Sequence, residues 1–255
     1  MEFTKDIGKI QRLMAASSAG IARRKAIMDN LTIDSDTTII DIGCGGGHLL
    51  KLLAKSIGPN GRVYGLDPSK DQIAQAKIKC ADFKNVFLLN SSATEIDLDD
   101  ASCDIVTSTQ TLEYIPTVDA ALSECSRILK QYGGFINISI LWDHFRFFGA
   151  EKKLNERIHD AFRAHCSHQM LPMELPGKLK KLGYKHIKHK SLPFMITARD
   201  QNSPARYTEE VISAFVLEQG IDQSEVNEWR EQLMKAEKEG RFGFTSYPVL
   251  TMAIM

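Results

Sequence analysis

Residues 37–48 read TTIIDIGCGGGH and decide the fold class of this 255-residue chain. An apolar run of strand length, 37–42, leads directly into a glycine-rich turn at 43–47, and the residues after it have the apolar spacing of a helix. Glycine allows positive φ angles and lets a ligand approach the backbone closely. This order of strand, turn and helix is typical of α/β proteins that bind a ligand at the carboxyl ends of their strands.

Short β-branched runs alternate with helical stretches up to residue 141. Further strands are expected at 62–67, 85–90, 103–109 and 134–141. Because helices separate them, these strands should form a parallel sheet with helices on both faces. Outside this core, the spacing of apolar residues predicts helices over 7–31, 150–165, 173–182, 206–219 and 223–239, and strands over 186–192 and 246–255.

The composition argues against several classes of function. Lys and Arg total 32 and Asp and Glu total 32, so no net charge draws the chain onto a nucleic acid. The N-terminus does not resemble a signal peptide, and no apolar run reaches the ~18 residues of a membrane span. The five cysteines include no C-x-x-C pair, which favours reduced thiols and a cytoplasmic location. No metal site is expected, since the histidines and Cys166 of 159–168 fit no ordinary zinc pattern.

Two carboxylates indicate which ligand the turn prefers. A dinucleotide fingerprint that starts at Gly43 needs glycine at position 48, where this chain has His48. Asp41 places a carboxylate at the entrance of the turn, which is unfavourable for a pyrophosphate and favourable for an ammonium or sulfonium group. Asp67 follows the second strand, where a carboxylate can accept hydrogen bonds from both ribose hydroxyls. Asp67 alone would also fit NAD, but the combination favours a cationic nucleoside.

With these motifs, residues 37–141 resemble class I S-adenosylmethionine-dependent methyltransferases. They are similar to the small-molecule group that includes the ubiquinone and menaquinone C-methylases and the arsenite methylases. The matching segments are DIGCGGG (41–47), GLDPS (65–69), SSATEIDLDDASCDIV (91–106), TQTLEYIPTVDAALSECSRILK (109–130) and YGGFINIS (132–139). The resemblance implies a Rossmann-like, doubly wound α/β fold, with a seven-stranded, mostly parallel sheet and an antiparallel terminal strand.

The resemblance also implies the reaction and the residues that bind the cofactor. The expected reaction is in-line transfer of a methyl group from S-adenosylmethionine to a small molecule, with S-adenosylhomocysteine as the product. The implied cofactor-binding residues are Asp41, Gly43, Cys44, Gly45, Asp67, Pro68, Gln72, Ser92, Ala93 and Gln110. Ser92 departs from the family, which usually has an aspartate there to recognise the adenine amino group. Serine still accepts a hydrogen bond but brings no charge.

Three residues are candidates for contact with the substrate. Trp142 and His144 follow the fifth strand, and His165 lies after the next helix, in a segment that borders the substrate cavity in this fold. His144 is the first choice for a general base, against the alternative of a surface or structural histidine. No catalytic residue is assigned, because only a nucleophile that must lose a proton needs a base.

A single domain is expected over 1–255, since no repeat or low-complexity linker divides the chain. Its expected parts are an N-terminal helical cap (1–36), the cofactor-binding core (37–141), substrate-side helices and a strand (142–199), a helical insertion (200–245) and the terminal strand (246–255). The cap and the insertion would close over the site as a lid. The partner is a small methyl acceptor, and the chain is a monomer or a homodimer. The alternatives are an RNA or protein methyltransferase, and a cofactor-binding protein that transfers no methyl group.

Overall fold

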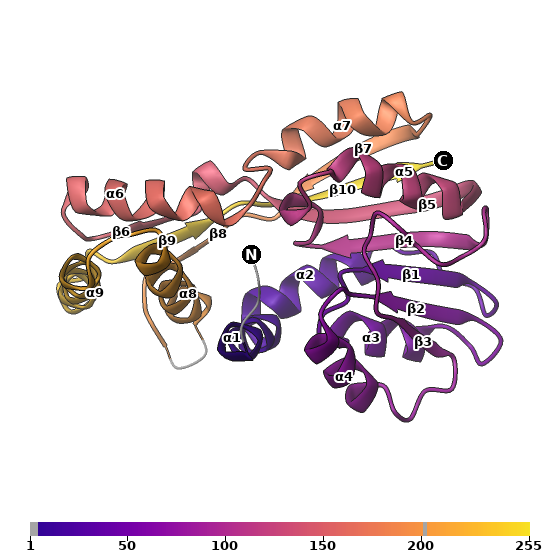
Figure 1. The fold of residues 1–255 in the computed structure, drawn as a ribbon, viewed down its shortest axis with the longest axis horizontal. Coiled ribbons are helices and arrows are strands. Elements are labelled where there is room, and N and C mark those ends of the chain that lie inside the picture. Colours follow the sequence, from indigo (N-terminus) through magenta and orange to yellow (C-terminus); the bar gives the residue numbers. More distant parts are fainter. Residues whose placement is uncertain (1–4, 201–202) are drawn as a thin grey trace.

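A computed structural model describes residues 5–200 and 203–255; the first four residues of the expected cap and residues 201 and 202 of the expected insertion lie outside it. A seven-stranded sheet has the order β3-β2-β1-β4-β5-β10-β7 (Figure 1). Strands β1 to β5 are parallel, and β10 runs antiparallel to β5 and β7. The bounds are β1 Thr38–Ile42, β2 Arg62–Leu66, β3 Val86–Leu89, β4 Cys103–Thr109, β5 Leu129–Ile140, β7 Lys185–Ser191 and β10 Pro248–Ile254. The predicted sheet is therefore confirmed.

Helices cover both faces of this sheet, as the crossover connections require. Apolar residues of α2, α3 and α4 pack on one face, and those of α5 and α7 pack on the other. The N-terminal α1 precedes α2 and contacts it. The bounds are α1 Lys5–Ala16, α2 Ser18–Met28, α3 His48–Ser56, α4 Lys70–Lys79, α5 Val118–Ile128 and α7 Leu171–Lys181.

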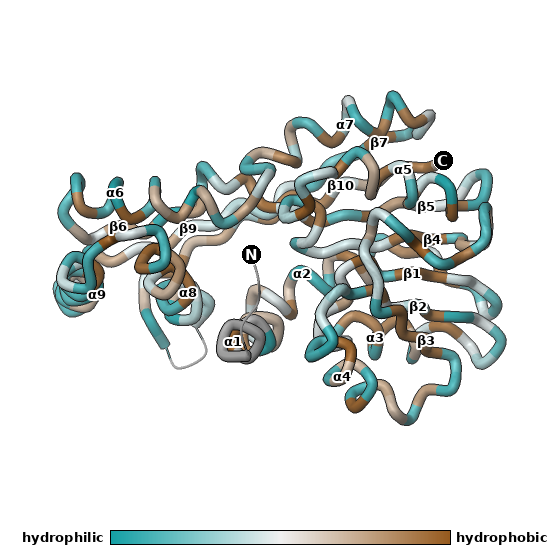
Figure 2. The backbone as a smooth tube through the Cα atoms, in the orientation of Figure 1, coloured by the Kyte–Doolittle hydropathy of each residue, from teal (hydrophilic) through white to brown (hydrophobic). Residues whose placement is uncertain are grey.

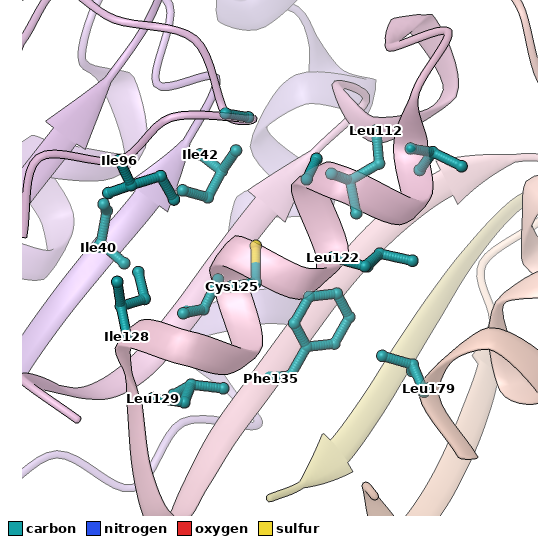
Figure 3. Close-up of a cluster of buried hydrophobic side chains, with 14 of the residues drawn as sticks. Ile40, Ile42, Ile96, Leu112, Leu122, Cys125, Ile128, Leu129, Phe135 and Leu179 are labelled. Carbon is teal, nitrogen blue, oxygen red and sulfur yellow. The ribbon is translucent and has the colours of Figure 1, made fainter. Parts of the chain in front are cut away.

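The central strands are apolar on both sides because both sides are covered. Ile39 of β1 joins the cluster under α3, and the next residue, Ile40, joins the cluster under α5. Figure 3 shows Ile40 close to Ile128 of α5. Apolar residues follow the strands of the sheet in Figure 2. Alternate side chains of a strand point to opposite faces, so a run such as TIIDI fills two cores at once.

A second, three-stranded antiparallel sheet of order β6-β9-β8 lies beside the first (Figure 1). It carries the helices α6, α8 and α9 and has an aromatic core of its own around Phe147, Trp229 and Phe244. The bounds are β6 Arg146–Phe148, α6 Lys152–Phe162, β8 Phe194–Ile196, α8 Pro204–Glu218, α9 Gln223–Lys238 and β9 Gly243–Ser246. We call these elements the second lobe.

The second lobe contains three strands that were not expected. The helical insertion expected over 200–245 contains α8 and α9, and its last residues belong to β9, which pairs with β6 and β8. The three strands are only three or four residues long. Such short strands show too little alternation to be recognised, and their pairing partners lie far away in the sequence.

Three short 3-10 helices follow strands or helices near the carboxyl edge of the large sheet. The first follows β4, the second follows β5, and the third follows α6. They are η1 Leu112–Tyr114, η2 Trp142–His144 and η3 Arg163–His165. Several expected site residues belong to these turns. No helix in residues 5–200 or 203–255 has both the length and the apolar character that crossing a membrane requires.

Candidate active site

The glycine-rich turn between β1 and α3 presents an open backbone surface. Gly43 and Gly45 have φ angles of 71° and 51°, a region that L side chains rarely adopt. A Cβ atom on Gly43 would lie 2.1 Å from Oγ1 of Thr111, so the residue after Gln110 seals that side of the turn. At Gly45, by contrast, the nearest atom to such a Cβ is Oε1 of Gln72 at 4.0 Å. Gly45 therefore borders open space that a ligand can fill.

Asp67 lies directly against this turn. Its Oδ2 accepts a hydrogen bond from the Gly45 amide at 2.9 Å, and its Oδ1 accepts one from the Ser69 amide at 2.9 Å. Asn90, at the end of β3, holds the same loop, because its Nδ2 donates to the Asp67 carbonyl oxygen at 2.9 Å. These hydrogen bonds fix the Asp67 side chain in place. Each carboxylate oxygen can accept more than one hydrogen bond, so Asp67 can still accept hydrogen bonds from a ligand.

Asp41 supplies the second carboxylate, at the end of β1. The Thr107 hydroxyl of β4 donates to its Oδ1 at 2.9 Å. Burial raises the pKa of Asp41 to about 7, against the opposing effect of Thr107, and the charge of Asp67 raises it further. Burial also raises the pKa of Asp67. Two buried carboxylates that disfavour each other's ionisation create a site that a cation stabilises.

Gln110 occupies a strained position just after β4. Its φ angle is 50°, in the left-handed region, while its amide donates to the Ile138 carbonyl of β5 at 2.7 Å. A residue other than glycine has a higher conformational energy there, and residues with such strained backbones often lie at functional sites. The backbone thereby turns away from the sheet at its carboxyl edge.

The remaining expected cofactor residues differ in their surroundings. Gln72 is buried, and a Cβ on Gly46 would lie 3.5 Å from its Oε1. Cys44 is buried, and burial raises the pKa of its thiol, so it is a packing residue and not an activated nucleophile. Pro68 is exposed.

Ser92 and Ala93 also lie on the loop that follows β3. The Ser92 hydroxyl is 2.8 Å from that of Thr94 and accepts a hydrogen bond from the Thr94 amide, so it serves its own turn. Ala93 packs into the core under α5. The side chain at the position of the family's aspartate is therefore held within the loop.

Arg12 of α1 was not predicted to belong to the site. Its guanidinium donates to Asp71 of α4 at 2.7 Å. A Cβ on Gly46 would lie 3.4 Å from Cδ of Arg12, so this side chain extends over the glycine-rich turn. Helix α1 also contacts α4 and the second lobe's α8 (Figure 1). Sequence spacing carries no signal for a contact between segments this far apart.

Trp142 and His165, two of the three expected substrate residues, are brought together. Their rings are 4.3 Å apart, edge to face, and His165 stacks on Phe162 at 3.9 Å. Tyr114 of η1 contacts both rings, at 6.3 Å from Trp142 and 5.8 Å from His165. We call Tyr114, Trp142, Phe162 and His165 the aromatic cluster. Burial lowers the pKa of His165 to about 4, so its imidazole is neutral near pH 7.

His144 lies in different surroundings from the aromatic cluster. Its side chain is exposed, and its ring is 5.8 Å from that of Tyr247. It lines a groove of about 510 Å³ on the second lobe, together with residues such as Arg146, Met195 and Thr245. The structure thus separates the proposed general base from the other two substrate candidates.

Two further ionisable residues, Glu113 beside Tyr114 in η1 and Arg23 in α2, are buried and were missed by the sequence analysis. Glu113 is fully buried, and its carboxylate accepts hydrogen bonds from the Ser139 hydroxyl at 2.9 Å and the Ile140 amide at 3.4 Å. Burial raises the pKa of Glu113 to about 7. Arg23 of α2 is also buried and interacts electrostatically with Tyr114 and Glu113. Neither residue belongs to a recognisable sequence motif, because its burial depends on segments that are distant in the chain.

Other parts of the described chain contain fewer candidate functional groups. No group of three or more His, Cys, Asp or Glu side chains that could hold a metal ion exists among the described residues. A cavity of about 540 Å³ lies at the opposite, amino edge of the sheet, where its lining includes Asp34, Asp104 and Lys130. Lys130 and Asp104 pair with each other there at 2.8 Å.

Comparison with known proteins gives three kinds of match. Residues 33–228 match the family described as "Methyltransferase domain". The demethylmenaquinone methyltransferase of Staphylococcus aureus is 36% identical over 110 residues, which are 43% of this chain and 46% of the relative. The match thus spans about half the length of that relative.

Solved structures share the fold at low sequence identity. The YcgJ protein from Bacillus subtilis has a TM-score of 0.65 at 15% identity, with 92% of this chain and 98% of that one covered. A phosphoethanolamine N-methyltransferase 2 from Haemonchus contortus, solved in complex with S-adenosyl-L-methionine, has a TM-score of 0.65 at 17% identity, covering 100% of this chain and 58% of that one.

Proposed function

This chain belongs to the methyltransferase domain family, and we propose that it transfers a methyl group from S-adenosylmethionine to a small molecule. The observation that carries the proposal is the open turn at Gly45 with the carboxylates of Asp41 and Asp67 beside it. A cationic nucleoside complements both features, because its positive charge offsets the buried carboxylates and its body fills the open space. The relatives named above support the same reading.

The residues of the turn fit this cofactor in type and placement. Ionised Asp41 would attract the positively charged methionyl end, and Asp67 would accept hydrogen bonds from the ribose hydroxyls. Gln72 and Pro68 would flank the adenine, next to the loop of Ser92 and Ala93. Because Ser92 and Thr94 bind each other, recognition of the adenine amino group falls to the backbone of this loop. Gln110 would face the methionyl end.

When bound, S-adenosylmethionine supplies an electrophilic methyl group on a cationic sulfur, which keeps the electron pair of the broken bond while the lone pair of the acceptor forms the new one. The protein's part is to align the acceptor and to exclude water. Such alignment can supply roughly 7–11 kcal/mol of a barrier. Arg12 and α1 lie over the turn, and Trp142 and His165 would contact the acceptor. An acceptor that carries a proton would release it after or during the attack.

A small acceptor agrees with the balanced charge of the chain and with the burial of Trp142 and His165 in the aromatic cluster. A macromolecular substrate would need a broad docking surface, usually basic for a nucleic acid. We therefore propose a small-molecule substrate. Methyl transfer to RNA or to protein in the activity test would contradict this proposal. That test follows the methyl-labelled product from a cell extract by mass spectrometry.

Replacing Asp67 by Asn tests the cofactor site. The change keeps the size of the side chain but removes the charge and one acceptor, so the affinity for S-adenosylmethionine should fall about 10- to 100-fold. Asp36→Asn is the matched control, because Asp36 is exposed at the opposite edge of the sheet and should bind as the unmodified protein does. Isothermal titration calorimetry measures both. Equal affinity in the two variants would reject this site, as would saturation by a nicotinamide dinucleotide in place of S-adenosylmethionine.

A further inference from the structure

The groove beside His144 lies where the two sheets join. In the described chain, three strand-to-strand connections pass between the large sheet and the second lobe, from β5 to β6, from β7 to β8 and from β9 to β10 (Figure 1). One residue of each connection lines the groove, namely His144, Pro193 and Tyr247. Its volume of about 510 Å³ is that of a site for a small molecule, and such sites often lie between two structural units.

The uncovered face of the small sheet forms the apolar wall of the groove. Helices α6, α8 and α9 pack on the opposite face, which carries Phe147 and Phe244. Because alternate side chains of a strand point to opposite faces, Phe148 and Met195 lie on the side without helices. They are 50% and 71% exposed, and both line the groove. Exposed apolar side chains in a hollow are suited to contact the apolar body of a ligand.

Arg146 adds a positive charge to this wall. It lies opposite Thr245 in the pairing of β6 with β9, and Met195 lies opposite Thr245 in the pairing of β8 with β9. The three side chains therefore form one row across the uncovered face. Arg146 is half-buried, and its Nε donates a hydrogen bond to the carbonyl oxygen of Asp143 at 3.2 Å. No ion pair holds its guanidinium within residues 5–200 and 203–255, so it has donors left for a ligand.

The acidic residue of the lining does not neutralise Arg146. Asp143 is the one acidic side chain among the described residues that line the groove, and its carboxylate pairs with Arg163 of η3. The charge of Arg146 is therefore left over. A surplus cation attracts an anion, and a guanidinium group binds the oxygens of a carboxylate, sulfonate or phosphate well.

Hydrogen bonds hold the walls of the groove against each other. The Thr245 hydroxyl donates to the carbonyl oxygen of His144 at 3.0 Å, and the Leu141 amide donates to the carbonyl oxygen of Tyr247 at 3.0 Å. The rings of His144 and Tyr247 are 5.8 Å apart. These contacts join β9 and the residue after it to η2 and its preceding residue. A site whose walls are fixed in this way loses less entropy when a ligand binds.

We propose that this groove is a second binding site, for a small molecule that carries an oxyanion on an apolar body. The oxyanion pairs with Arg146, and the apolar body lies on Phe148 and Met195. The site is separate from the cofactor turn, because Gly45 and Asp67 follow β1 and β2, whereas the groove is lined by the second lobe and its connections. The inference therefore does not depend on methyl transfer.

A matched pair of fluorescent probes tests the role of the charge. The anion 8-anilinonaphthalene-1-sulfonate differs from neutral N-phenyl-1-naphthylamine by its sulfonate, and both probes become brighter in an apolar site. Arg146→Gln should weaken binding of the sulfonate about tenfold, through loss of a charge-assisted bond, and should change binding of the neutral probe less than about twofold. Absence of saturable sulfonate binding to the unmodified protein, or an unchanged affinity in Arg146→Gln, would overturn the proposal.

Two controls accompany this titration. Arg157→Gln removes an equal charge from α6 of the same lobe, where Arg157 pairs with Glu225 outside the groove, and should bind both probes as the unmodified protein does. The sulfonate should also bind equally well when S-adenosylhomocysteine is present, because the two sites are separate. Equal weakening in Arg157→Gln, or displacement of the probe by S-adenosylhomocysteine, would place the probe elsewhere and overturn the proposal.

A second variant tests the apolar wall and does not depend on how Arg146→Gln folds. Met195→Ser changes an exposed side chain and should weaken both probes severalfold. Met234→Ser is the matched control, because Met234 is 43% exposed on α9 and does not line the groove. Sedimentation velocity is measured on the same proteins. A dimer that Met195→Ser dissociates would show that a second copy covers this face, and would overturn the proposal, as would unchanged probe binding in Met195→Ser.

Discussion

Asp41 couples the candidate site to pH at the level of a single residue. Burial opposes its ionisation and raises its pKa to about 7, whereas its ordinary value is 3.8. An acid whose pKa is raised by folding stabilises the protein fully below the unfolded value, and that contribution is lost as pH rises toward 7. A bound cation has the opposite preference, because it favours the ionised carboxylate. Binding of the cofactor should therefore cause Asp41 to release its proton.

The raised pKa of Asp41 predicts that cofactor binding depends on pH. Affinity for S-adenosylmethionine should fall about tenfold when the pH is lowered from 8 to 6, because Asp41 must ionise before it attracts the cation. Asp41→Asn should bind weakly at pH 8 and lose this part of the pH dependence. Calorimetric titrations of both proteins at pH 6, 7 and 8 provide the comparison, which also removes the effect of ligand titration. An identical pH profile in the variant would assign the dependence to another group.

At the scale of the element, α1 is joined to the glycine-rich turn and α4 through one partly exposed side chain, that of Arg12. It covers the glycine-rich turn through Arg12, whose ion pair with Asp71 leaves the two side chains 26% and 43% exposed. Ion pairs of that kind contribute about 0–1 kcal/mol. We propose that a helix held in this way lifts from the turn and returns, which would give the cofactor a path into the site.

Breaking that ion pair should loosen α1 without destroying the site. In Arg12→Met, amide hydrogens of 12–16 should exchange severalfold faster, and S-adenosylhomocysteine should dissociate faster, since the cover opens more often. Lys25→Met is the control, because Lys25 of α2 pairs with Asp29, which follows the helix, and both side chains are more exposed. Hydrogen exchange and stopped-flow dissociation measure the two effects. Unchanged exchange in Arg12→Met would mean that other contacts hold the helix.

At the scale of the whole molecule, the candidate site contains residues from the hydrophobic cores of the large sheet and from the hydrophobic core of the second lobe. The large sheet has a cluster on each face, and the second lobe has a separate aromatic cluster. Within the latter, Trp229 contacts Phe147 at 5.4 Å, and its Nε1 donates to Asn155 at 2.9 Å. The aromatic cluster of the site belongs largely to this second core, through Trp142 and Phe162. The proposed substrate contacts and the proposed cofactor contacts thus depend on different cores.

Weakening the second core should therefore affect the two ligands differently. Phe147 is fully buried, so Phe147→Ala should cost about 3–5 kcal/mol of local stability and speed hydrogen exchange in α6, α8 and α9. Affinity for S-adenosylmethionine should change little. Phe148→Ala on the same strand is the control, because Phe148 is 50% exposed. If β1 to β4 lost protection equally, the molecule would be one cooperative unit and this division would be wrong.

The sequence by itself determined the large sheet and the turn between β1 and α3. Both are local patterns: apolar runs of strand length, helices between them, glycines where the backbone must turn, and carboxylates at strand ends. Parallel strands bring their carboxyl ends to one edge, so Asp41, Gly45 and Asp67 were expected to lie together, as they do.

Only the tertiary structure decided what covers that edge. Arg12, Arg23 and Glu113 come from α1, α2 and η1, and no local pattern distinguishes them from other charged residues. The pairing of β9 with β6 and β8 joins segments far apart in the chain. His144 and His165 were both expected to contact the substrate, yet His144 is exposed and His165 is buried. Periodicity records which face of an element is apolar, but the partner of that face, and the burial and charge that result, depend on packing between distant segments.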